Sequence, residues 1–354
     1  MKIAIDTGPL ESGDSVRGIG VHTKLLLENL EKLKDLKVEA VDVRKVDLGK
    51  YDLVHYQKFH PYFFSVPFRK IKPSVLTIHD LIYLIYPKHY PPGVMGKLKF
   101  PIQKFFVKNI DAIITISETS KKDIVRFLGI PAEKIHVAYL APREIFRKLE
   151  MSNPLRGENY KLKIAKRYGL PERFVLYVGD VNYNKNLLGL VKACKIAKVP
   201  LVIVGKQATS TDFDRNHPEN KPLVELLNTY GNDKNVIRLG FIDDSELVGV
   251  YNLAGVYCQP SFYEGFGLPV LEAFASGCPV VAAKTQALVE IADPACIFAN
   301  PKDPKDIADK ISMVLEDKEL RDQLVETGMV FVKNYSWAKT AKETAEVYKK
   351  VLSK

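Results

Sequence analysis

The sequence predicts an α/β protein made of two domains, each built on a doubly wound parallel sheet. Strand-like and helix-like segments alternate along all 354 residues, and this alternation favours parallel sheets covered by helices. The chain is too long for one ordinary core and suits two domains of common size. Its composition, 46% hydrophobic and 27% charged residues, is that of a globular protein.

In the first half, short apolar runs between polar or turn residues indicate six strands. A helix is expected over about residues 20–34, because four leucines share one of its faces: Leu25, Leu26, Leu30 and Leu33. The predicted strands are Lys2–Asp6, Val38–Val43, Asp52–His55, Ser74–Ile78, Asp111–Ser117 and Lys134–Ala138.

The second half indicates five further strands and a final amphipathic helix over Trp337–Leu352. A polar stretch from about Arg147 to Lys166 contains Pro and Gly and is the natural linker. Residues 1–155 would then form the first domain and residues 156–337 the second. The predicted strands are Phe174–Gly179, Pro200–Gly205, Val236–Leu239, Val256–Gln259 and Pro279–Ala283.

The chain is basic, with a formal charge of +10 and a pI near 9.1. Such a surface suits nucleic acid, an anionic membrane face or phosphorylated small molecules. We expect no nucleic-acid partner, because no nucleic-acid-binding module is recognisable in the sequence.

One segment of this basic chain, Lys97–Lys108, mixes Lys and Phe at near-helical spacing. It has two interpretations: contact with an anionic membrane, or an ordinary amphipathic helix with Phe105 and Phe106 in the core. The second is favoured, and Pro101 is expected to limit the helix to its C-terminal part.

Several features indicate a cytoplasmic protein. No apolar run reaches the length that spans a bilayer; the longest, Val75–Ile85, is interrupted by a His-Asp pair. The residues Met1–Asp6 resemble a strand opening and not a signal peptide. Four cysteines lie in apolar stretches without metal-ligand spacing, so we expect them to be buried in a reducing compartment: Cys194, Cys258, Cys278 and Cys296.

The most informative stretch, E-G-F-G-L-P-V-L-E, joins a strand end to a helix start and runs from Glu264 to Glu272. Gly265 and Gly267 let the backbone approach a ligand closely, and the N–H groups of a helix start attract an anion. Pro269 suits the first helical position, where a missing N–H costs nothing. Carboxylates accept hydrogen bonds from hydroxyls but repel phosphate, so a nucleotide sugar suits this stretch better than a plain nucleotide.

This stretch, continued by A-F-A-S-G-C-P-V-V, resembles the signature of the retaining family 4 glycosyltransferases. The resemblance implies the GT-B fold, in which two Rossmann-like domains face each other across a cleft. The first domain would admit the acceptor, the second would bind the donor, and the terminal helix (about residues 338–354) would return to the first. The implied reaction moves a hexose from a UDP- or GDP-linked sugar to a glycan or lipid-linked acceptor.

The resemblance also implies roles for single residues. Glu264 would hold hydroxyls of the transferred sugar, Glu272 would accept from the ribose hydroxyls, and Lys185 would stabilise the leaving diphosphate. No metal is expected, because no Asp-x-Asp motif sits at a plausible loop and cations with a helix dipole can replace the ion. Phosphate oxygens would be held by backbone groups of the loop formed by Gly265, Phe266, Gly267 and Leu268.

Lys185 belongs to a second matching segment, Val175–Asn186, which resembles the donor-phosphate loop of the family. Asn186 is expected to cap the following helix. Many members carry an arginine after the glycine, where this chain has Asp180. A carboxylate there repels a diphosphate, so a compensating cation is expected among Arg17, Lys206 and Lys284.

The first domain contains three weaker matches. Gly18 and Gly20, in R-G-I-G-V-H, resemble the N-terminal Gly loop of the family. His79, in T-I-H-D-L, matches a histidine that reaches the sugar or its acceptor in relatives. The alternative is a core histidine, with Asp80 as its partner or as a helix cap. The segment S-E-T-S is expected first to provide a helix cap, by Ser117 or Thr119, and second to contact the acceptor.

Two other loops bear on the cleft. Residues 238–242 would lie beside the nucleobase, with Phe241 among the donor-binding residues. The family often has an Asn-Gly pair in the loop where this chain has residues 139–142, so the acceptor geometry is expected to differ.

Alternative functions are a sugar phosphorylase, a nucleotide-sugar epimerase, or a nucleotide- or glycan-binding relative without catalysis, which Asp180 suggests. A dehydrogenase is disfavoured, because no G-x-G-x-x-G motif follows a strand with an acidic residue about 20 positions later.

Overall fold

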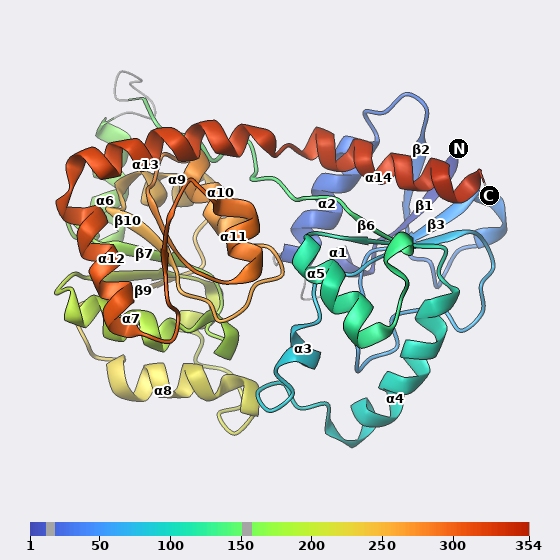
Figure 1. The fold of residues 1–354 in the computed structure, drawn as a ribbon, viewed down its shortest axis with the longest axis horizontal. Coiled ribbons are helices and arrows are strands. Elements are labelled where there is room, and N and C mark those ends of the chain that lie inside the picture. The colour runs from blue at the N-terminus through green and yellow to red at the C-terminus, as the bar shows by residue number, and fades with distance from the viewer. Residues whose placement is uncertain (12–17, 151–157, 354) are drawn as a thin grey trace. The chain divides into compact units, whose positions relative to one another are not determined.

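The computed structural model describes residues 1–11, 18–150 and 158–353. The chain forms two compact units: unit 1 comprises Met1–Ala141 and Tyr335–Lys354, and unit 2 comprises Pro142–Asn334. Each unit is a six-stranded parallel sheet with helices around it (Figure 1), which confirms the predicted α/β fold. The units divide near residues 141 and 334, whereas the sequence places the boundaries near residues 155 and 337.

The sheet of unit 1 has the order β2-β1-β3-β4-β5-β6, and all neighbouring strands are parallel. The strand order reverses between β1 and β3, and α/β sheets place ligands beyond the carboxyl ends of the strands at such a point. The strands are β1 (Lys2–Asp6), β2 (Lys37–Val41), β3 (Leu53–Tyr56), β4 (Ser74–Thr77), β5 (Ala112–Thr115) and β6 (Ile135–Val137).

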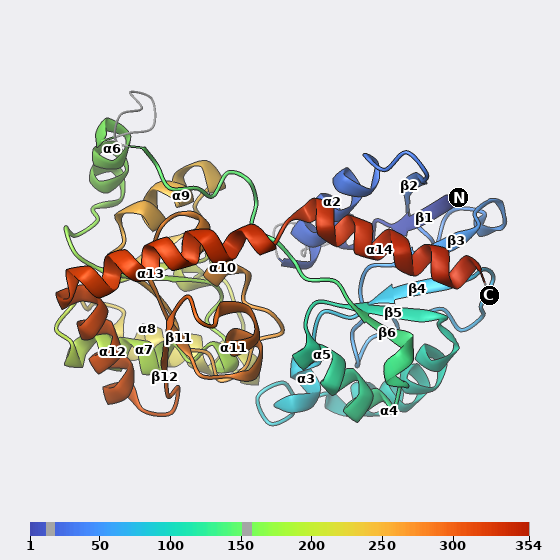
Figure 2. The same cartoon turned by 45° about the horizontal axis from the view of Figure 1, so that its top comes forward.

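The terminal helix α14 (Trp337–Leu352) packs along α2 within unit 1 (Figure 2). The Thr340 hydroxyl donates to the Tyr139 carbonyl over 2.6 Å, and the Tyr348 hydroxyl lies 2.6 Å from Nδ1 of buried His55. The other helices of unit 1 in the described part of the chain are α1 (Gly8–Glu11), α2 (Gly18–Leu30), α3 (Ile82–Ile85), α4 (Gly93–Phe106) and α5 (Glu118–Asp123).

The sheet of unit 2 has the order β12-β11-β10-β7-β8-β9 and is also parallel, with its reversal between β7 and β10. Its last strand, β12, is not among the predicted strands because it has only three residues and no alternating pattern. The strands are β7 (Val175–Val178), β8 (Leu201–Val204), β9 (Val236–Gly240), β10 (Val256–Gln259), β11 (Val280–Ala283) and β12 (Ile297–Ala299).

Helices pack on this sheet in contacting pairs, including α7 with α12, α6 with α9 and α10 with α13. The buried side of α7 and α12 belongs to one large apolar core with the inner strands. The helices of unit 2 in the described part of the chain are α6 (Glu158–Tyr168), α7 (Leu187–Ile196), α8 (Lys221–Tyr230), α9 (Asp244–Leu253), α10 (Leu268–Ala275), α11 (Gln286–Ala292), α12 (Pro304–Glu316) and α13 (Lys318–Phe331).

Two helix predictions are wrong in detail. Helix α2 begins at Gly18 and ends at Leu30, so Leu33 lies outside it. Helix α4 continues through Pro101, because that residue is exposed and water can satisfy the carbonyl that loses its partner.

The core interpretation of the Lys97–Lys108 segment is also wrong for Phe105, which is 66% exposed, while Phe106 packs partly against the core. The four cysteines are buried thiols, as predicted. Across residues 1–11, 18–150 and 158–353, no helix is long and apolar enough to cross a membrane.

Candidate functional site

The site in unit 2 lies where the strand order reverses. The loops that follow β7 and β10 leave the same edge of the sheet, because these neighbouring strands are parallel. The loop after β7 leads through a 3₁₀ turn, Tyr183–Lys185, into α7, and the loop after β10 leads into α10. The two loops are tied together, since the Phe262 amide donates to the Asn184 carbonyl over 2.7 Å.

Glu264 is the centre of a buried hydrogen-bond network. The Lys185 ammonium group donates to both carboxylate oxygens of Glu264, over 2.9 Å to Oε1 and 2.8 Å to Oε2. Oε1 also accepts from Gln259 Nε2 at 2.7 Å and from the Ser261 hydroxyl at 2.6 Å. The Tyr257 hydroxyl in turn donates to Gln259 Oε1. Glu264 is 7% exposed, so this set of donors holds an ionised carboxylate in a fixed orientation.

Lys185 is positioned by the two asparagines beside it. The buried Asn184 side chain donates to the Tyr263 carbonyl over 3.1 Å. Asn186 adopts a left-handed backbone, with a φ of 53°, and donates from its side chain to the carbonyls of Pro260 and Pro301. Asn186 holds the N-cap position of α7, as expected, but its side chain forms no cap hydrogen bond, because its amide contacts the loop after β10.

The glycine at the start of α10 is required by both backbone and packing. Gly267 has a φ of 116°, which L side chains rarely adopt, and a Cβ there would lie 2.6 Å from Cδ2 of Leu288. Gly267 thus allows α11 to pack directly against the loop that carries Glu264. Helix α10 begins at Leu268, so Pro269 is its second residue, whereas the sequence predicts it as the first; the first turn still requires no amide hydrogen from it.

Glu272, on α10, forms a second charged cluster that the sequence does not predict. Its Oε1 accepts from Arg143 Nη2 over 2.9 Å, and the other terminal nitrogen of Arg143 pairs with Asp244. The Tyr251 hydroxyl donates to Oε2 over 3.3 Å. Burial raises the pKa of Glu272, and the Arg143 guanidinium opposes that shift.

Arg143 lies directly after the loop where an Asn-Gly pair is expected. Its guanidinium also stacks 4.9 Å from the Phe146 ring, and its Nε is buried with no hydrogen-bond partner among the described residues. The residue before it is a proline, so the segment carries no helix or strand signal that could have indicated a role.

Asp180 follows Gly179 at the carboxyl end of β7. Its main-chain carbonyl accepts from the Tyr177 hydroxyl over 2.7 Å. Of the proposed compensating cations, Lys206 and Lys284 are both exposed and neither pairs with Asp180 in the described part of the chain. Arg17 lies outside the described residues.

The carboxyl ends of β7, β8 and β9 come together at three glycines. The Gly205 amide donates to the Gly240 carbonyl over 2.8 Å, and a Cβ on Gly205 would lie 2.2 Å from the Gly179 carbonyl oxygen. Phe241, the residue after β9, is 61% exposed. The other two glycines are covered by side chains, since a Cβ would lie 2.6 Å from the Thr209 hydroxyl at Gly240 and 2.9 Å from the Tyr177 hydroxyl at Gly179.

Three predicted site residues belong to unit 1. Gly18 and Gly20 form the first turn of α2 rather than a loop before it. His79 follows β4, and its Nε2 lies 2.7 Å from Nδ1 of His22, on α2. Burial and the neighbouring His79 lower the pKa of His22 well below its usual value. The Asp80 carboxylate accepts from the Ile82 amide at the start of α3, which agrees with the helix-cap alternative for Asp80.

Of the two predicted cap residues, Ser117 is the N-cap of α5, and Thr119 lies within the helix. The Ser117 hydroxyl accepts from the Ser120 amide over 2.9 Å at the start of α5. The Ser120 hydroxyl donates to the His79 carbonyl over 2.8 Å, so this cap also fixes the segment that carries His79.

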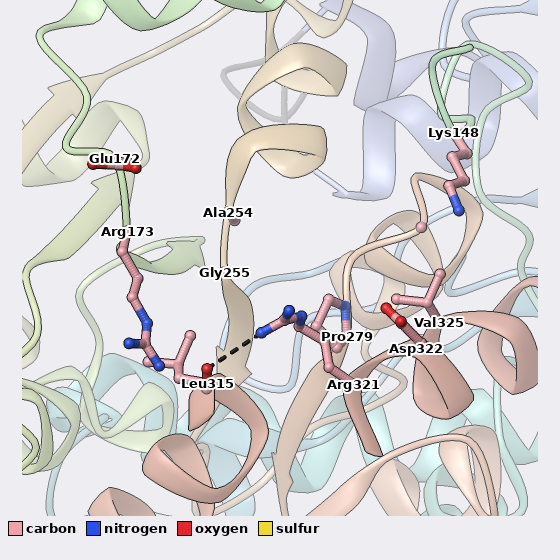
Figure 3. Close-up of a pocket in the computed structure, with 11 residues that line it drawn as sticks. Lys148, Glu172, Arg173, Ala254, Gly255, Pro279, Leu315, Arg321, Asp322 and Val325 are labelled. Carbon is pink, nitrogen blue, oxygen red and sulfur yellow. Dashed lines mark hydrogen bonds between the residues drawn. The ribbon is translucent and has the colours of Figure 1, made fainter. Parts of the chain in front are cut away.

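A separate pocket of about 620 Å³ lies at the opposite edge of the unit 2 sheet (Figure 3). Gly255 and Pro279 line it from just before β10 and β11, so it faces the amino ends of the strands. Arg321, whose guanidinium donates to the Leu315 carbonyl, stands across from Arg173. The residues of the Glu264 network do not line it.

Comparisons with known proteins agree along both units. Residues 161–331 match the family described as glycosyl transferases group 1, and residues 4–141 match Glycosyltransferase Family 4. O-antigen chain mannosyltransferase B of Escherichia coli is 27% identical over 301 residues, which are 82% of this chain and 74% of that protein.

Two solved structures have the same fold. Sucrose-phosphate synthase from Thermosynechococcus elongatus has a TM-score of 0.74 at 19% identity and covers 100% of this chain and 99% of its own. Anabaena HepE in complex with UDP and glucose has a TM-score of 0.73 at 17% identity and covers 99% of this chain and 100% of its own.

Proposed function

Because the chain belongs to the family 4 glycosyltransferases with the GT-B fold, we propose that it moves a hexose from a nucleoside diphosphate sugar to a glycan or lipid-linked acceptor. The relative from Escherichia coli is named for mannosyl transfer to an O-antigen chain, which supports a hexose and a glycan acceptor. The complex of the Anabaena protein with UDP and glucose supports a UDP-linked donor, with a GDP-linked donor as the other candidate. The contact between Lys185 and Glu264 at the strand reversal carries the proposal.

The Glu264 carboxylate has one oxygen suited to the transferred sugar. Oε1 already accepts from Lys185, Gln259 and Ser261, whereas Oε2 accepts only from Lys185 among the residues that the structure describes. Each carboxylate oxygen offers about two lone pairs, so Oε2 is the oxygen that can accept a sugar hydroxyl. Lys185 meanwhile neutralises Glu264, which lets a negatively charged diphosphate approach a buried carboxylate.

The start of α10 and Glu272 would hold the rest of the donor. The positive end of the α10 dipole and the backbone of Gly265 to Leu268 suit phosphate oxygens. Glu272 accepts from Arg143 and Tyr251, which leaves lone pairs for the ribose hydroxyls. Arg143 does not reach the donor in this scheme; it is a positioning residue that fixes the orientation of Glu272.

We propose a retaining reaction that needs no metal ion. The glycosidic bond to the diphosphate would break with oxocarbenium character, and the acceptor hydroxyl would attack the face from which the diphosphate leaves. The departing phosphate oxygen takes the acceptor proton, so no separate protein base is required. Lys185 would stabilise the charge that develops on that phosphate. His79, held by His22, would contact the sugar or the acceptor from unit 1.

A further part of the proposal is the location of the protein and the membrane contact of unit 1. We propose polysaccharide biosynthesis in the cytoplasm, with peripheral contact at an anionic membrane face. The basic Lys97–Lys108 segment supports that contact, because its apolar side chains and lysines are both exposed.

Thermal unfolding across a panel of UDP- and GDP-sugars tests the proposal. A donor at about a hundredfold its dissociation constant adds about 2.7 kcal/mol to the free energy of unfolding. One sugar nucleotide should raise the melting temperature, and that nucleotide should then label an acceptor. Stabilisation by no member of the panel would contradict the proposal.

Two further assays separate the rival activities. Sugar released to inorganic phosphate would indicate a phosphorylase, and an altered sugar nucleotide formed without acceptor would indicate an epimerase. Stabilisation without any turnover would favour the non-catalytic relative, for which the Asp180 carboxylate at the phosphate loop is the supporting observation.

A further inference from the structure

A pocket of about 740 Å³ lies in unit 1 where its strand order reverses. It is lined by Asp6, the last residue of β1, and by Tyr56, the last residue of β3. Arg44 and Lys58 bring cations to the same wall. Burial raises the pKa of Asp6, and the nearby Arg44 opposes that shift. Arg44 also pairs with Asp42 over 3.0 Å. A pocket lined by a carboxylate and basic side chains suits a ligand that carries both hydroxyls and phosphate.

The rim of this pocket is apolar and exposed. Phe63, Phe64 and Ile71 line the pocket, and each belongs to the exposed large apolar residues of the chain. Rings continue from this rim to α4: Phe64, Phe68, Phe106 and Phe105 follow one another with centroid distances of 4.9, 5.1 and 5.3 Å. The pocket therefore opens beside α4.

Helix α4 presents an apolar stripe on its outer face. Leu98 is 61% and Phe105 is 66% exposed. Each is three or four positions from another exposed apolar residue of the helix. Such spacing places them on one side of the helix. The helix lies at the periphery of unit 1 (Figure 1). The stripe consists of Val94, Met95, Leu98, Ile102 and Phe105.

The loop and the helix form one rigid surface. Gln103, on the buried side of α4, accepts from the Ser65 amide over 2.8 Å and donates to the carbonyls of His60 and Phe63. The Lys99 ammonium group stands 5.5 Å from the Phe64 ring centroid. The exposed rings are thus held in place by a fully buried amide.

The charge of the whole chain is concentrated in this segment. Residues 53–110 contain nine Lys and Arg and one Asp, a net charge of +8, against +10 for the whole chain. An apolar stripe flanked by lysines suits the boundary between anionic headgroups and acyl chains. A second copy of the same face would be repelled by its like charge.

We propose that this face, the α4 stripe together with Phe63, Phe64, Phe68 and Ile71, docks unit 1 on an anionic lipid bilayer. The pocket at its rim then receives the phosphate-linked sugar headgroup of a lipid-anchored acceptor. The acceptor part rests on the proposed sugar transfer. The docking part specifies the surface for the membrane contact proposed above and does not depend on sugar transfer. The acceptor class follows from the pocket, since an anchored headgroup can enter only where the rim meets the bilayer.

Sedimentation with vesicles tests the docking. The full chain should bind vesicles of phosphatidylcholine and phosphatidylglycerol and not of phosphatidylcholine alone, and about 0.5 M NaCl should weaken binding about tenfold or more. The double variant Leu98→Glu with Phe105→Glu should lose that binding at least tenfold. Val330→Glu is the matched control, because Val330 is 61% exposed on α13 of unit 2.

The position of the pocket rim can be measured with a fluorophore. All four native cysteines are buried, so a cysteine introduced by Phe64→Cys can be labelled selectively with an environment-sensitive dye. Anionic vesicles should raise its emission, and lipids with a nitroxide in the acyl chain should quench it. A dye attached through Val330→Cys should respond to neither.

The outcomes separate the two proposals. Absence of vesicle binding by a protein that sugar nucleotides stabilise contradicts the docking and the membrane contact, and leaves the proposed sugar transfer intact. Vesicle binding without a response from the dye at position 64 contradicts entry of the acceptor at the rim. Vesicle binding and dye response with no effect of any sugar nucleotide uphold the docking and contradict the proposed function alone.

Discussion

The Lys185 ammonium nitrogen lies 2.8 and 2.9 Å from the two carboxylate oxygens of Glu264, which is 79 positions later in the chain. The pair joins the loops that follow two neighbouring parallel strands, β7 and β10. Each partner compensates the charge of the other before a donor arrives. Binding of a diphosphate adds negative charge at this point, so Lys185 must be shared between the carboxylate and the phosphate.

Glu264→Gln should separate sugar transfer from nucleotide binding. The neutral amide cannot offer a charged acceptor to the sugar hydroxyl, so we expect transfer to fall about 10²- to 10³-fold. UDP or GDP without sugar should still stabilise the protein, because Lys185 loses its counter-charge and attracts phosphate more strongly. Product formation and melting temperature measure the two effects.

The control for this variant is Glu225→Gln, an exposed glutamate on α8. It should change neither transfer nor nucleotide-dependent stabilisation. Transfer at the parent rate by the Glu264→Gln protein would show that the carboxylate does not serve the reaction.

Arg143→Met should destabilise unit 2. The change removes the partner of Glu272, which is 3% exposed, and leaves a buried carboxylate without compensation. Breaking a buried pair costs about 3–5 kcal/mol; we expect about 2 kcal/mol, because the Arg143 side chain is 23% exposed. Urea unfolding at pH 7 measures the loss.

A second change tests the origin of that loss. Adding Glu272→Gln to Arg143→Met should restore part of the stability, since the uncompensated charge is removed. Arg167→Met breaks the more exposed pair with Glu246 and should cost less than about 1 kcal/mol. Equal losses for Arg143→Met and Arg167→Met would argue against a buried charge cluster.

Much of the fold follows from local patterns. Eleven of the twelve strands coincide with predicted runs, because parallel strands buried on both faces appear as short apolar segments between turns. The missed strand β12 has three residues, too few for a pattern. The prediction that Pro101 limits helix α4 is wrong, since the sequence does not reveal which face of a helix will be exposed.

The candidate site was only partly predictable. Glu264 and Glu272 stand in one motif with Gly267 and Pro269, so spacing indicates them. Arg143 carries no such signal, because its partner Glu272 is 129 positions away and only the folded chain brings them together. Pairings of this kind depend on tertiary packing.

Gly267→Ala should destabilise unit 2 and disturb the loop of Glu264. The methyl group meets Leu288 at 2.6 Å in a backbone conformation that alanine rarely adopts, so we expect a cost of about 2–4 kcal/mol. Gly18→Ala is the control, because a Cβ there has no neighbour within 4 Å among the described residues. It should not destabilise the protein, since alanine favours a helix. Thermal unfolding compares them, and a neutral Gly267→Ala would contradict the packing argument.

Unit 1 should lose stability in acid because of His55. Burial lowers the pKa of His55 to about 3, so the folded chain keeps it neutral while the unfolded chain binds a proton below about pH 6.5. Stability that is present above pH 6.5 is therefore lost as the pH falls toward 3, at up to about 1.4 kcal/mol per pH unit. His55→Asn should flatten that slope, whereas the exposed control His217→Asn should not. Fluorescence of Trp337, the only tryptophan and a residue of unit 1, reports the unfolding, and equal slopes for all three proteins would rule out His55 as the acid-sensitive group.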